Sequence, residues 1–460
     1  MSKRYVVDTS WRRLPNEHIV IAGSPLKVFR ITAAGEKVID ALETGTSLPV
    51  GHEPLTSRLE AAGAIHPVFD GLIHPAEIEV VIPAYIATND QAEHLQLLID
   101  VLQPLQITVV DDASPIPVSC AGANVVRHES NKGPAAARNT GALRTQSPYI
   151  AFIDTDCVVS AEDVLAAAMH FSSPTVGLVA PRVATIEDDS LISQYESANS
   201  PLDMGDQPAQ VQPMSRVSYV PSAVLLTRTE TFTELGGFDT AHRYGEDVDL
   251  VWRAIDNGWQ CRYDPHVVCL HRNRGSWREL VQQRMSYGEA AATLYVAHPS
   301  RLAPLRADAA TAASVVTSVV GMPLAAFAST ALSASALWKE LRRADVPLGT
   351  ILRIIVDRWM HTVYMITQAI SRVWLPIIVI VALFSRRARR LLIFTALFPI
   401  AYEQRPKSTR KTPVRTIPLA TVMRILDLGG YCAGVWKGMA RNRTIGPLLP
   451  RISVKRSPSD

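Results

Sequence analysis

Two aspartates, Asp154 and Asp156, follow directly after the apolar run YIAFI and are separated by one residue. Because side chains alternate along an extended segment, this spacing puts both carboxylates on one face. Hard oxygen ligands suit Mg²⁺ or Mn²⁺, ions that keep several waters and bind substrate phosphates. The pair therefore predicts a divalent metal site, although two aspartates at this spacing also occur in proteins without one.

A second pair of carboxylates, Asp111 and Asp112, ends the apolar run TVV and precedes a Ser114–Pro115 turn. Such carboxylates can accept hydrogen bonds from a base imide or a ribose hydroxyl, so both residues are candidates for nucleotide binding. The alternative, strongest for Asp111, is an aspartate that only caps the following turn.

The segment NKGPAAARNTG places Pro134 in the first turn of a helix, where its missing amide hydrogen costs nothing. Arg138 lies one turn further on. Its guanidinium offers a fork of donors suited to the oxygens of a diphosphate or a uracil. The alternative is an arginine on the protein surface.

Two acidic residues, Glu246 and Asp247, follow Gly245 and open the helix that continues through LVWRAIDNGW. Acidic side chains at this end stabilise a helix through its dipole, which is the structural alternative. The catalytic interpretation makes Asp247 the base that takes the proton of an acceptor hydroxyl while a metal neutralises a leaving diphosphate. Glu246 and Trp252 are then the candidates for the acceptor side.

The elements that carry these residues alternate between β-branched apolar runs and helical stretches from Glu77 onward. This alternation is typical of an α/β fold with a parallel sheet buried on both faces. In such sheets ligands bind outside the carboxyl ends of the strands. We therefore expect the strand-end residues Pro83, Tyr85, Asp112 and Asp154 to share one edge.

The first 75 residues form a separate small module in this interpretation, with a strand at HIVIAG and helices at TAAGEKVIDALETG and around LTSRLEAAGAIHP. The pattern resembles the winged-helix peptide-recognition domains of ribosomal-peptide modification systems. The alternative is a packing module without a binding role. We place a catalytic domain at residues 76–300 and a helical, apolar and basic region at 301–460.

The C-terminal region has three apolar stretches. No charged side chain occurs from Ala309 to Trp338, which leaves a membrane-spanning helix and a soluble helix equally open. The shorter runs VWLPIIVIVALF and LLIFTALFPIAY flank the basic SRRARR and predict interfacial helices, a hairpin or buried helices. From Ser385 onward there are 16 Lys or Arg against three Asp or Glu. This excess suits an anionic membrane surface or a solvated tail.

The composition is that of an ordinary globular chain, with a net charge of +3, 47% hydrophobic and 19% charged residues. It excludes a wholly disordered protein and indicates no nucleic-acid partner. Five widely spaced cysteines predict reduced thiols. Residues 1–16 lack the apolar core of a secretory signal, so we expect the protein in the cytoplasm or on the cytoplasmic face of the cell membrane.

Taken in order, VVIPAY, VVDDAS, NKGPAAARNTG, FIDTD and GGFD…GEDVDLVWR resemble the motifs of glycosyltransferase family 2 over about residues 77–275. The resemblance implies the GT-A fold, a Rossmann-like mixed sheet with helices on both faces. It also implies that Pro83, Tyr85, Asp112 and Arg138 contact the nucleotide, that Asp154 and Asp156 handle diphosphate and metal, and that Asp247 is the base. His271 would add a metal or diphosphate contact, or be a loop histidine. The Gln-x-x-Arg-Trp motif of processive synthases is missing at its usual place.

A narrower resemblance spans almost the whole chain through APRV, SPLDMG, VSYVPSAVLL and GEDVDLVWR. In these motifs the chain is similar to the glycosyltransferases of the mycofactocin system. This implies transfer of glucose from UDP-glucose, with inversion, to a peptide-derived redox cofactor precursor as a β-1,4-linked chain. Two alternatives remain: transfer to a membrane lipid or cell-wall glycan, and a catalytically inert peptide-binding module.

Overall fold

The computed structural model describes residues 4–14, 18–272, 275–343, 346–404 and 417–453. The chain divides into two compact units, Met1–Arg13 with Val20–Asn273 and Leu14–Ile19 with Arg274–Asp460. The second unit therefore begins before residue 300, where the sequence placed the domain boundary. The reason is that helix α9 (Trp277–Ala297) packs along α15 (Ile417–Asn442) rather than on the sheet.

The N-terminal module has a hydrophobic core of its own, with Val20, Phe29, Ile39 and Leu59 at its centre. Helix α1 ends at Gly45, as the sequence predicted, and the Thr32 side chain caps its N-terminus. The described residues of the module form two helices and five short strands: β1 (Arg4–Val7), β2 (Arg12–Leu14), β3 (Ile19–Ala22), β4 (Lys27–Arg30), α1 (Ala33–Thr44), α2 (Glu53–Ala61) and β5 (Ile65–Val68). Strand β1 pairs with β5, and β3 lies between β2 and β4.

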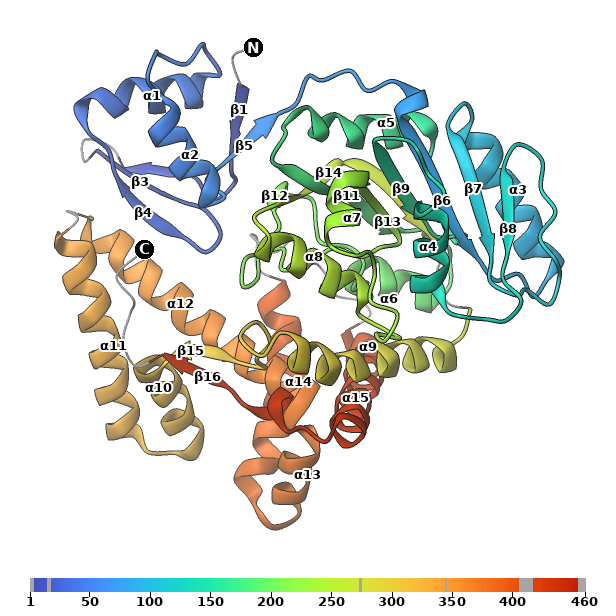
Figure 1. Ribbon diagram of the computed structural model, residues 1–460. Helices are drawn as coiled ribbons and strands as arrows, with labels where there is room; N and C mark the ends of the chain where they lie inside the picture. Colours follow the sequence, from blue (N-terminus) through green and yellow to red (C-terminus); the bar gives the residue numbers. More distant parts are fainter. Residues whose placement is uncertain (1–3, 15–17, 273–274, 344–345, 405–416, 454–460) are drawn as a thin grey trace. The chain divides into compact units, whose positions relative to one another are not determined.

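A mixed sheet dominates the rest of the first unit (Figure 1). Its strands run in the order β10-β14-β11-β13-β9-β6-β7-β8, and β12 pairs with β14. Strands β9, β6, β7 and β8 are parallel, whereas β13 is antiparallel to both of its neighbours. The strands are β6 (Ile78–Ala84), β7 (Gln106–Asp111), β8 (Asn124–Arg127), β9 (Tyr149–Ile153), β10 (Cys157–Val158), β11 (Val176–Thr185), β12 (Ala209–Gln210), β13 (Val224–Arg228) and β14 (Gln260–His271).

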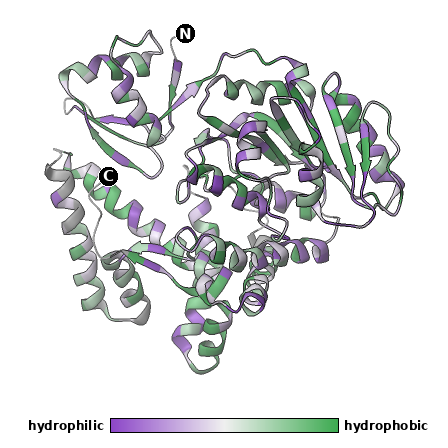
Figure 2. Ribbon diagram, viewed as in Figure 1, coloured by the Kyte–Doolittle hydropathy of each residue, from purple (hydrophilic) through white to green (hydrophobic). Residues whose placement is uncertain are grey.

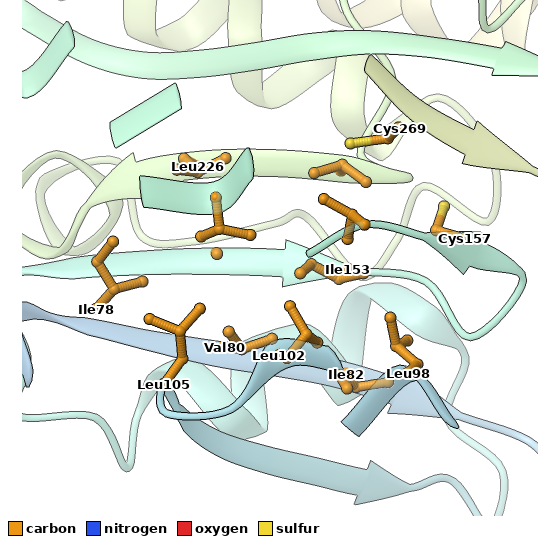
Figure 3. Packing of buried hydrophobic residues seen from close by; sticks show 14 of the residues in the cluster. Ile78, Val80, Ile82, Leu98, Leu102, Leu105, Ile153, Cys157, Leu226 and Cys269 are labelled. Atoms are coloured by element: carbon orange, nitrogen blue, oxygen red, sulfur yellow. The ribbon is translucent and has the colours of Figure 1, made fainter. Parts of the chain in front are cut away.

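Helices cover both faces of this sheet, as the sequence predicted. On one face, alternate residues of β6 such as Val80 and Ile82 pack with Leu98 and Leu102 of α3 (Figure 3). On the other, Gly141 of α4 lies so close to β6 that an added Cβ would be 2.3 Å from Val81 Cγ1. The helices are α3 (Asn89–Leu102), α4 (Pro134–Ala142), α5 (Ala161–Ala168), α6 (Leu191–Asn199), α7 (Thr229–Glu234) and α8 (Glu246–Asp256).

The second unit is mostly helical. Besides α9 and α15 it contains α10 (Ala309–Val320), α11 (Pro323–Arg343), α12 (Leu348–Ala369), α13 (Leu375–Phe384), α14 (Arg386–Glu403), and the paired short strands β15 (Arg306–Asp308) and β16 (Arg451–Ser453). One continuous spanning helix from Ala309 to Trp338 is wrong, because Gly321 adopts a φ of 81° and separates α10 from α11. The five cysteines are free, as expected.

The two short apolar runs form a helical hairpin, α13 and α14, with the turn at Ser385 (Figure 1). Among the described residues, one helical stretch is long and apolar enough to cross a membrane, Leu348–Phe384, with a mean hydropathy of 1.9 in its most apolar window. Of that window, 44% is buried inside the structure, and a core helix of a soluble protein can pass the same test of length and composition. Length and composition alone therefore do not make it a membrane span.

Three glycines of α15, spaced four residues apart, let this helix approach α9 at backbone contact. A Cβ added to Gly434 would lie 2.0 Å from the Met285 carbonyl oxygen, and one on Gly438 would lie 2.5 Å from that of Glu289. Small residues at this spacing are the usual means of bringing two helix backbones together.

Replacing Gly434 with alanine is therefore expected to destabilise the helical unit. Alanine favours a helix by about 1 kcal/mol over glycine, but inserting a methyl into packed backbone costs roughly 1–3 kcal/mol or more. Thermal unfolding of the full chain followed by circular dichroism should show a lower midpoint. Gly429→Ala is the matched control, because a Cβ added there would have no atom within 4 Å. An equal or higher midpoint for Gly434→Ala would contradict this packing.

Candidate active site

The candidate site lies at the carboxyl edge of β6, β7 and β9. These strands are parallel, so their ends meet at one edge of the sheet, and the residues just beyond them are Tyr85, Asp112 and Asp154. The backbone N–H of Asp112 donates to the Ala84 carbonyl at 2.8 Å, which holds these two strand ends together. Tyr85 is 51% exposed, and Pro83 is half-buried. Both are accessible, and their contact with a nucleotide stays a prediction.

Asp112 is buried and organises the entrance to helix α4. Its Oδ2 accepts from the backbone N–H of Gly133 at 2.7 Å and its Oδ1 from that of Lys132 at 2.9 Å. Its Oδ1 also lies 2.7 Å from Nδ1 of His128, whose Nε2 contacts Thr140. The carboxylate thus fixes the turn at the helix N-terminus, a position where backbone N–H groups suit an anionic ligand.

Asp111 has a more local environment. Its carboxylate accepts the backbone N–H groups of Ser114 at 2.8 Å and Val118 at 3.1 Å, and it pairs with Arg127. Burial raises the pKa of Asp111, but these hydrogen bonds outweigh burial and lower it overall. The bonds agree with the turn-capping alternative, and a direct nucleotide contact stays a prediction.

Arg138 is the electrostatic centre of the site and is only 2% exposed. Its Nη2 donates to Asp154 Oδ1 at 2.6 Å and its Nη1 to Glu246 Oε1 at 3.0 Å. Burial lowers the pKa of this guanidinium, but the two carboxylates outweigh burial and raise it. Its Nε has no hydrogen-bond partner among the described residues, and the guanidinium lies 5.4 Å from the centre of the Phe238 ring. Arg138 therefore remains charged and links α4, β9 and α8.

The predicted metal ligands lie together at the ends of β9 and β14. His271 Nε2 is 3.3 Å from Asp156 Oδ2, and burial together with the charge of Asp156 raises the pKa of Asp154. Within the described residues, no group of three or more His, Cys, Asp or Glu side chains could by itself hold a metal ion. Half-buried carboxylates beside an imidazole fit an ion that takes its other ligands from water and a diphosphate. Asp156 and His271 are the residues that would hold it, whereas one oxygen of Asp154 already accepts from Arg138. Metal binding by Asp154, Asp156 and His271 stays a prediction.

The acidic N-terminus of α8 carries the predicted base. Asp247 Oδ1 accepts the backbone N–H of Val248 at 2.8 Å, and its Oδ2 accepts that of Ser222 at 3.2 Å. Burial raises the pKa of Asp247, and these N–H groups oppose the rise. Burial and then the charge of Asp247 raise the pKa of Glu246 to about 7, against the opposing effect of Arg138. A carboxylate with a raised pKa is a better proton acceptor at neutral pH than an ordinary aspartate.

Trp252 is placed less favourably for the acceptor than the sequence suggested. It is 4% exposed, and its indole N–H donates to the Ser218 carbonyl at 2.9 Å. This bond joins it to the loop 211–223, which precedes β13, so contact with an acceptor stays a prediction. Glu246 also remains an acceptor-side candidate, although its carboxylate is engaged by Arg138.

Sequence reasoning missed three residues that hold the site together. His128 bridges Asp112 and Thr140, and Ser222 supports Asp247. Asn139 exchanges hydrogen bonds with both the N–H and the carbonyl of Phe238, which ties α4 to the GGFD turn. Asn139 lies in a recognised motif, but no spacing rule links it to a residue 99 positions away.

The rate of transfer is expected to fall as the pH drops through about 7. In the enzyme without substrate, the two neighbouring carboxyl groups of Glu246 and Asp247 take up a proton at about pH 7, the pKa of Glu246. The protonated pair is a poor base. The acid limb of the kcat/KM profile measures this. In Glu246→Gln the neighbouring charge is gone, so the limb should move to lower pH. If the acid limb stays at the same pH in this variant, another group is responsible for it.

Comparison with known proteins identifies the class. The family model described as Glycosyl transferase family 2 matches residues 79–227. A curated relative is 32% identical over 461 residues, with 97% of both chains covered. The chain therefore belongs to glycosyltransferase family 2, and it is an enzyme that transfers a sugar from a nucleotide donor. Inversion at the anomeric carbon fits this family.

The full-length relatives define a narrower similarity. They are the pre-mycofactocin glycosyltransferases of Mycobacterium tuberculosis strains CDC 1551 / Oshkosh and ATCC 25618 / H37Rv, each 32% identical. Among solved structures, a mannosyltransferase from Pyrobaculum calidifontis in complex with GDP-Man and Mn²⁺ is 15% identical, with a TM-score of 0.42. That match covers 80% of this chain and 91% of the other. A likeness at this level transfers no ligand to the present chain.

Proposed function

We propose that this enzyme transfers glucose from UDP-glucose to pre-mycofactocin with inversion and builds a β-1,4-linked chain on this peptide-derived acceptor. The observation that carries the proposal is the match to pre-mycofactocin glycosyltransferases over 97% of both chains. It includes the N-terminal module and the helical unit, which lie outside residues 79–227. A family 2 enzyme with an unrelated acceptor would need to share only the catalytic part.

Contacts outside the family motifs hold the segments that carry the narrower resemblance in place. Arg182, in APRV, makes a bidentate pair with Asp203, in SPLDMG, at 2.8–3.2 Å. The hydroxyl of Tyr263 donates to the Gly205 carbonyl at 2.6 Å. These bonds fix the loop that contains SPLDMG against β11 and β14. The unusual motifs of the narrower resemblance therefore have a structural role near the sheet that carries the site.

In the proposed reaction, the carboxylate of Asp247 takes the proton of an acceptor hydroxyl. The acceptor oxygen then bonds to the anomeric carbon as the bond from that carbon to the diphosphate oxygen breaks. A divalent ion bound at Asp156 and His271 would neutralise the charge of the leaving diphosphate. Arg138 keeps the buried carboxylates of Asp154 and Glu246 in position, because a charged guanidinium offsets both of them.

The test is mass spectrometry of pre-mycofactocin incubated with the purified full chain, Mn²⁺ and UDP-glucose, with UDP-galactose, UDP-N-acetylglucosamine and GDP-mannose in parallel. We expect a ladder of hexose additions with UDP-glucose, removable by a β-1,4-specific glucanase. A ladder with another donor would overturn the donor assignment alone. No mass gain with any donor would overturn the acceptor assignment.

A second acceptor class, a membrane lipid, is favoured by one feature of the helical unit, the hairpin tip formed by residues 377–390. Leu383 is 69% and Phe384 86% exposed. The next turn carries four exposed arginines: Arg386, Arg387, Arg389 and Arg390. Figure 2 shows the apolar run along α13. Exposed apolar side chains beside a basic cluster fit an interface rich in anionic lipid. Residues 405–416 and 454–460 of the basic tail lie outside the described residues.

Contact between the hairpin tip and a membrane can also be tested if the acceptor is the soluble pre-mycofactocin. Sedimentation with anionic phosphatidylglycerol vesicles should bring down the wild type and much less of a Leu383→Ser/Phe384→Ser variant. Leu72→Ser, which removes an exposed leucine from the first unit, is the control and should still sediment. Equal sedimentation of all three would exclude the hairpin tip as the contact. Activity on pre-mycofactocin without vesicles would exclude a requirement for a lipid acceptor.

A further inference from the structure

The N-terminal module contacts the catalytic part of the first unit through two ion pairs. In one, Nη2 of Arg216 donates to Asp8 Oδ2 at 2.9 Å. In the other, Arg262 of β14 pairs with Glu60 of α2. The Asp8 carboxylate and Arg262 are almost fully buried. Buried pairs of this kind contribute orientation, because breaking one leaves an uncompensated charge.

Further hydrogen bonds hold the Asp8 carboxylate in the position in which it contacts Arg216. Its carboxylate also accepts from Ser10 and lies 3.0 Å from His66 Nε2. Burial raises the pKa of Asp8, but the hydrogen bonds from His66, Arg216 and Ser10 outweigh it and hold the pKa well below its ordinary value. Asp8 therefore stays charged at neutral pH and presents a fixed acceptor to Arg216.

Both ion pairs act on loop 211–223, the segment between β12 and β13. Arg216 lies in this loop, and its backbone N–H also donates to Ser24 Oγ of the module at 2.7 Å. Arg262 pairs with Gln210 in the β12–β14 ladder, directly before the loop begins. The module thus holds the loop at its start and at its turn.

The other end of the same loop supports the catalytic carboxylates. The Ser222 N–H donates to Asp247 Oδ2 at 3.2 Å, and the Ala223 carbonyl accepts the Asp154 N–H at 2.9 Å. The Ser218 carbonyl accepts the indole N–H of Trp252 at 2.9 Å, which ties the loop to α8. Between Arg216 and Ser222, the side chains of Val217 and Val220 are fully buried. The segment that joins Arg216 to Ser222 is therefore packed into the protein.

We propose that the N-terminal module positions the catalytic base, with Arg216 as the positioning residue that connects Asp8 and Ser24 to Asp247 through loop 211–223. The inference rests on the proposed function of Asp247 as base. It gives the module a role in the transfer step itself. Misplacing a reacting group by about 1 Å costs on the order of a hundredfold in rate, so loss of this connection should reduce kcat by roughly ten- to a hundredfold and leave donor binding unchanged.

The variants are Arg216→Gln, Asp8→Asn, their double mutant, and Ser24→Ala, a milder change that tests the loop if the others fail to fold. Arg4→Gln is the matched control, since it breaks the exposed Arg4–Asp70 pair of the same module. We expect kcat to fall in the four variants other than this control, with the affinity for UDP unchanged. The double mutant should be no slower than either single mutant. Arg216→Lys should recover part of the rate.

Hydrogen–deuterium exchange of loop 211–223 is measured in parallel because it needs no substrate. The backbone N–H groups between residues 217 and 223, apart from Pro221, should exchange faster in Arg216→Gln and Ser24→Ala than in the wild type and Arg4→Gln. Unchanged exchange and unchanged kcat in these variants would overturn the inference. Faster exchange in the variants, together with a wild type that transfers no tested sugar, would mean that the proposed function fails while the connection to the loop stands.

Discussion

Asp247→Asn is expected to reduce glycosyl transfer by about 10²–10⁴-fold, the usual contribution of a general base, and to leave UDP binding intact. The substitution keeps the size of the side chain, and its remaining oxygen can still accept one of the two backbone N–H groups that hold Asp247. It removes the negative charge of the carboxylate, because a neutral amide is not basic enough to take the proton. Initial rates of hexose addition and calorimetric UDP affinity measure the two effects separately.

The matched control is Asp256→Asn, which changes a carboxylate at the opposite end of the same helix and should leave the rate unchanged. Thermal unfolding checks that the buried amide has not loosened the loop at Ser222. A variant that loses UDP binding and transfer equally, with normal unfolding, would show that Asp247 maintains the donor site. Full activity would remove it from the mechanism.

The positions of the strand-end residues could be predicted from sequence because they depend on local patterns. Apolar β-branched runs place β6, β7 and β9, and parallel strands end at one edge, so Tyr85, Asp112 and Asp154 follow together. The helices that begin at Pro134 and Glu246 were likewise expected from a proline and from acidic residues at their first turns.

The partners of these residues could not be predicted, since they depend on contacts between distant segments. The nucleotide contact of Arg138 stays a prediction, and no pattern in the sequence indicates that its guanidinium bridges Asp154 and a glutamate 108 residues away. The contact of Asp8 with Arg216 spans 208 residues. Only the folded chain brings such charges together, and periodicity carries no information about them.

The apolar C-terminal segments show a different limit. A run without charges from Ala309 to Trp338 satisfies a hydropathy rule, yet the glycine at 321 ends the helix in a left-handed conformation. The longer apolar helix, Leu348–Phe384, contains charged residues such as Asp357 in its first half, so it was not recognised as one segment. Helix length depends on where the backbone can continue, which mean hydropathy does not measure.

Asp156→Asn is expected to abolish most of the metal-dependent transfer, by about 10²–10³-fold, the effect of removing one electrostatic stabiliser of a transition state. The amide keeps the size of the side chain near His271 Nε2, which lies 3.3 Å from the carboxylate in the wild type. It removes the negative charge that a hard cation prefers. Electron paramagnetic resonance of Mn²⁺ in the presence of UDP reports binding without turnover, and we expect weaker binding.

Asp188→Asn is the control. It changes an exposed carboxylate that accepts the backbone N–H of Ser190, and it should leave Mn²⁺ binding unchanged. The effect of Asp156→Asn on Mn²⁺ binding, compared with its effect on the rate of transfer, decides the role of Asp156. Weaker Mn²⁺ binding with a rate restored by excess Mn²⁺ identifies a metal ligand. Normal binding with a lost rate would instead place Asp156 on the diphosphate or the sugar. Since the carboxylate of Asp154 is already engaged by Arg138, a site that still binds Mn²⁺ without Asp156 would need His271 and the diphosphate to supply its ligands.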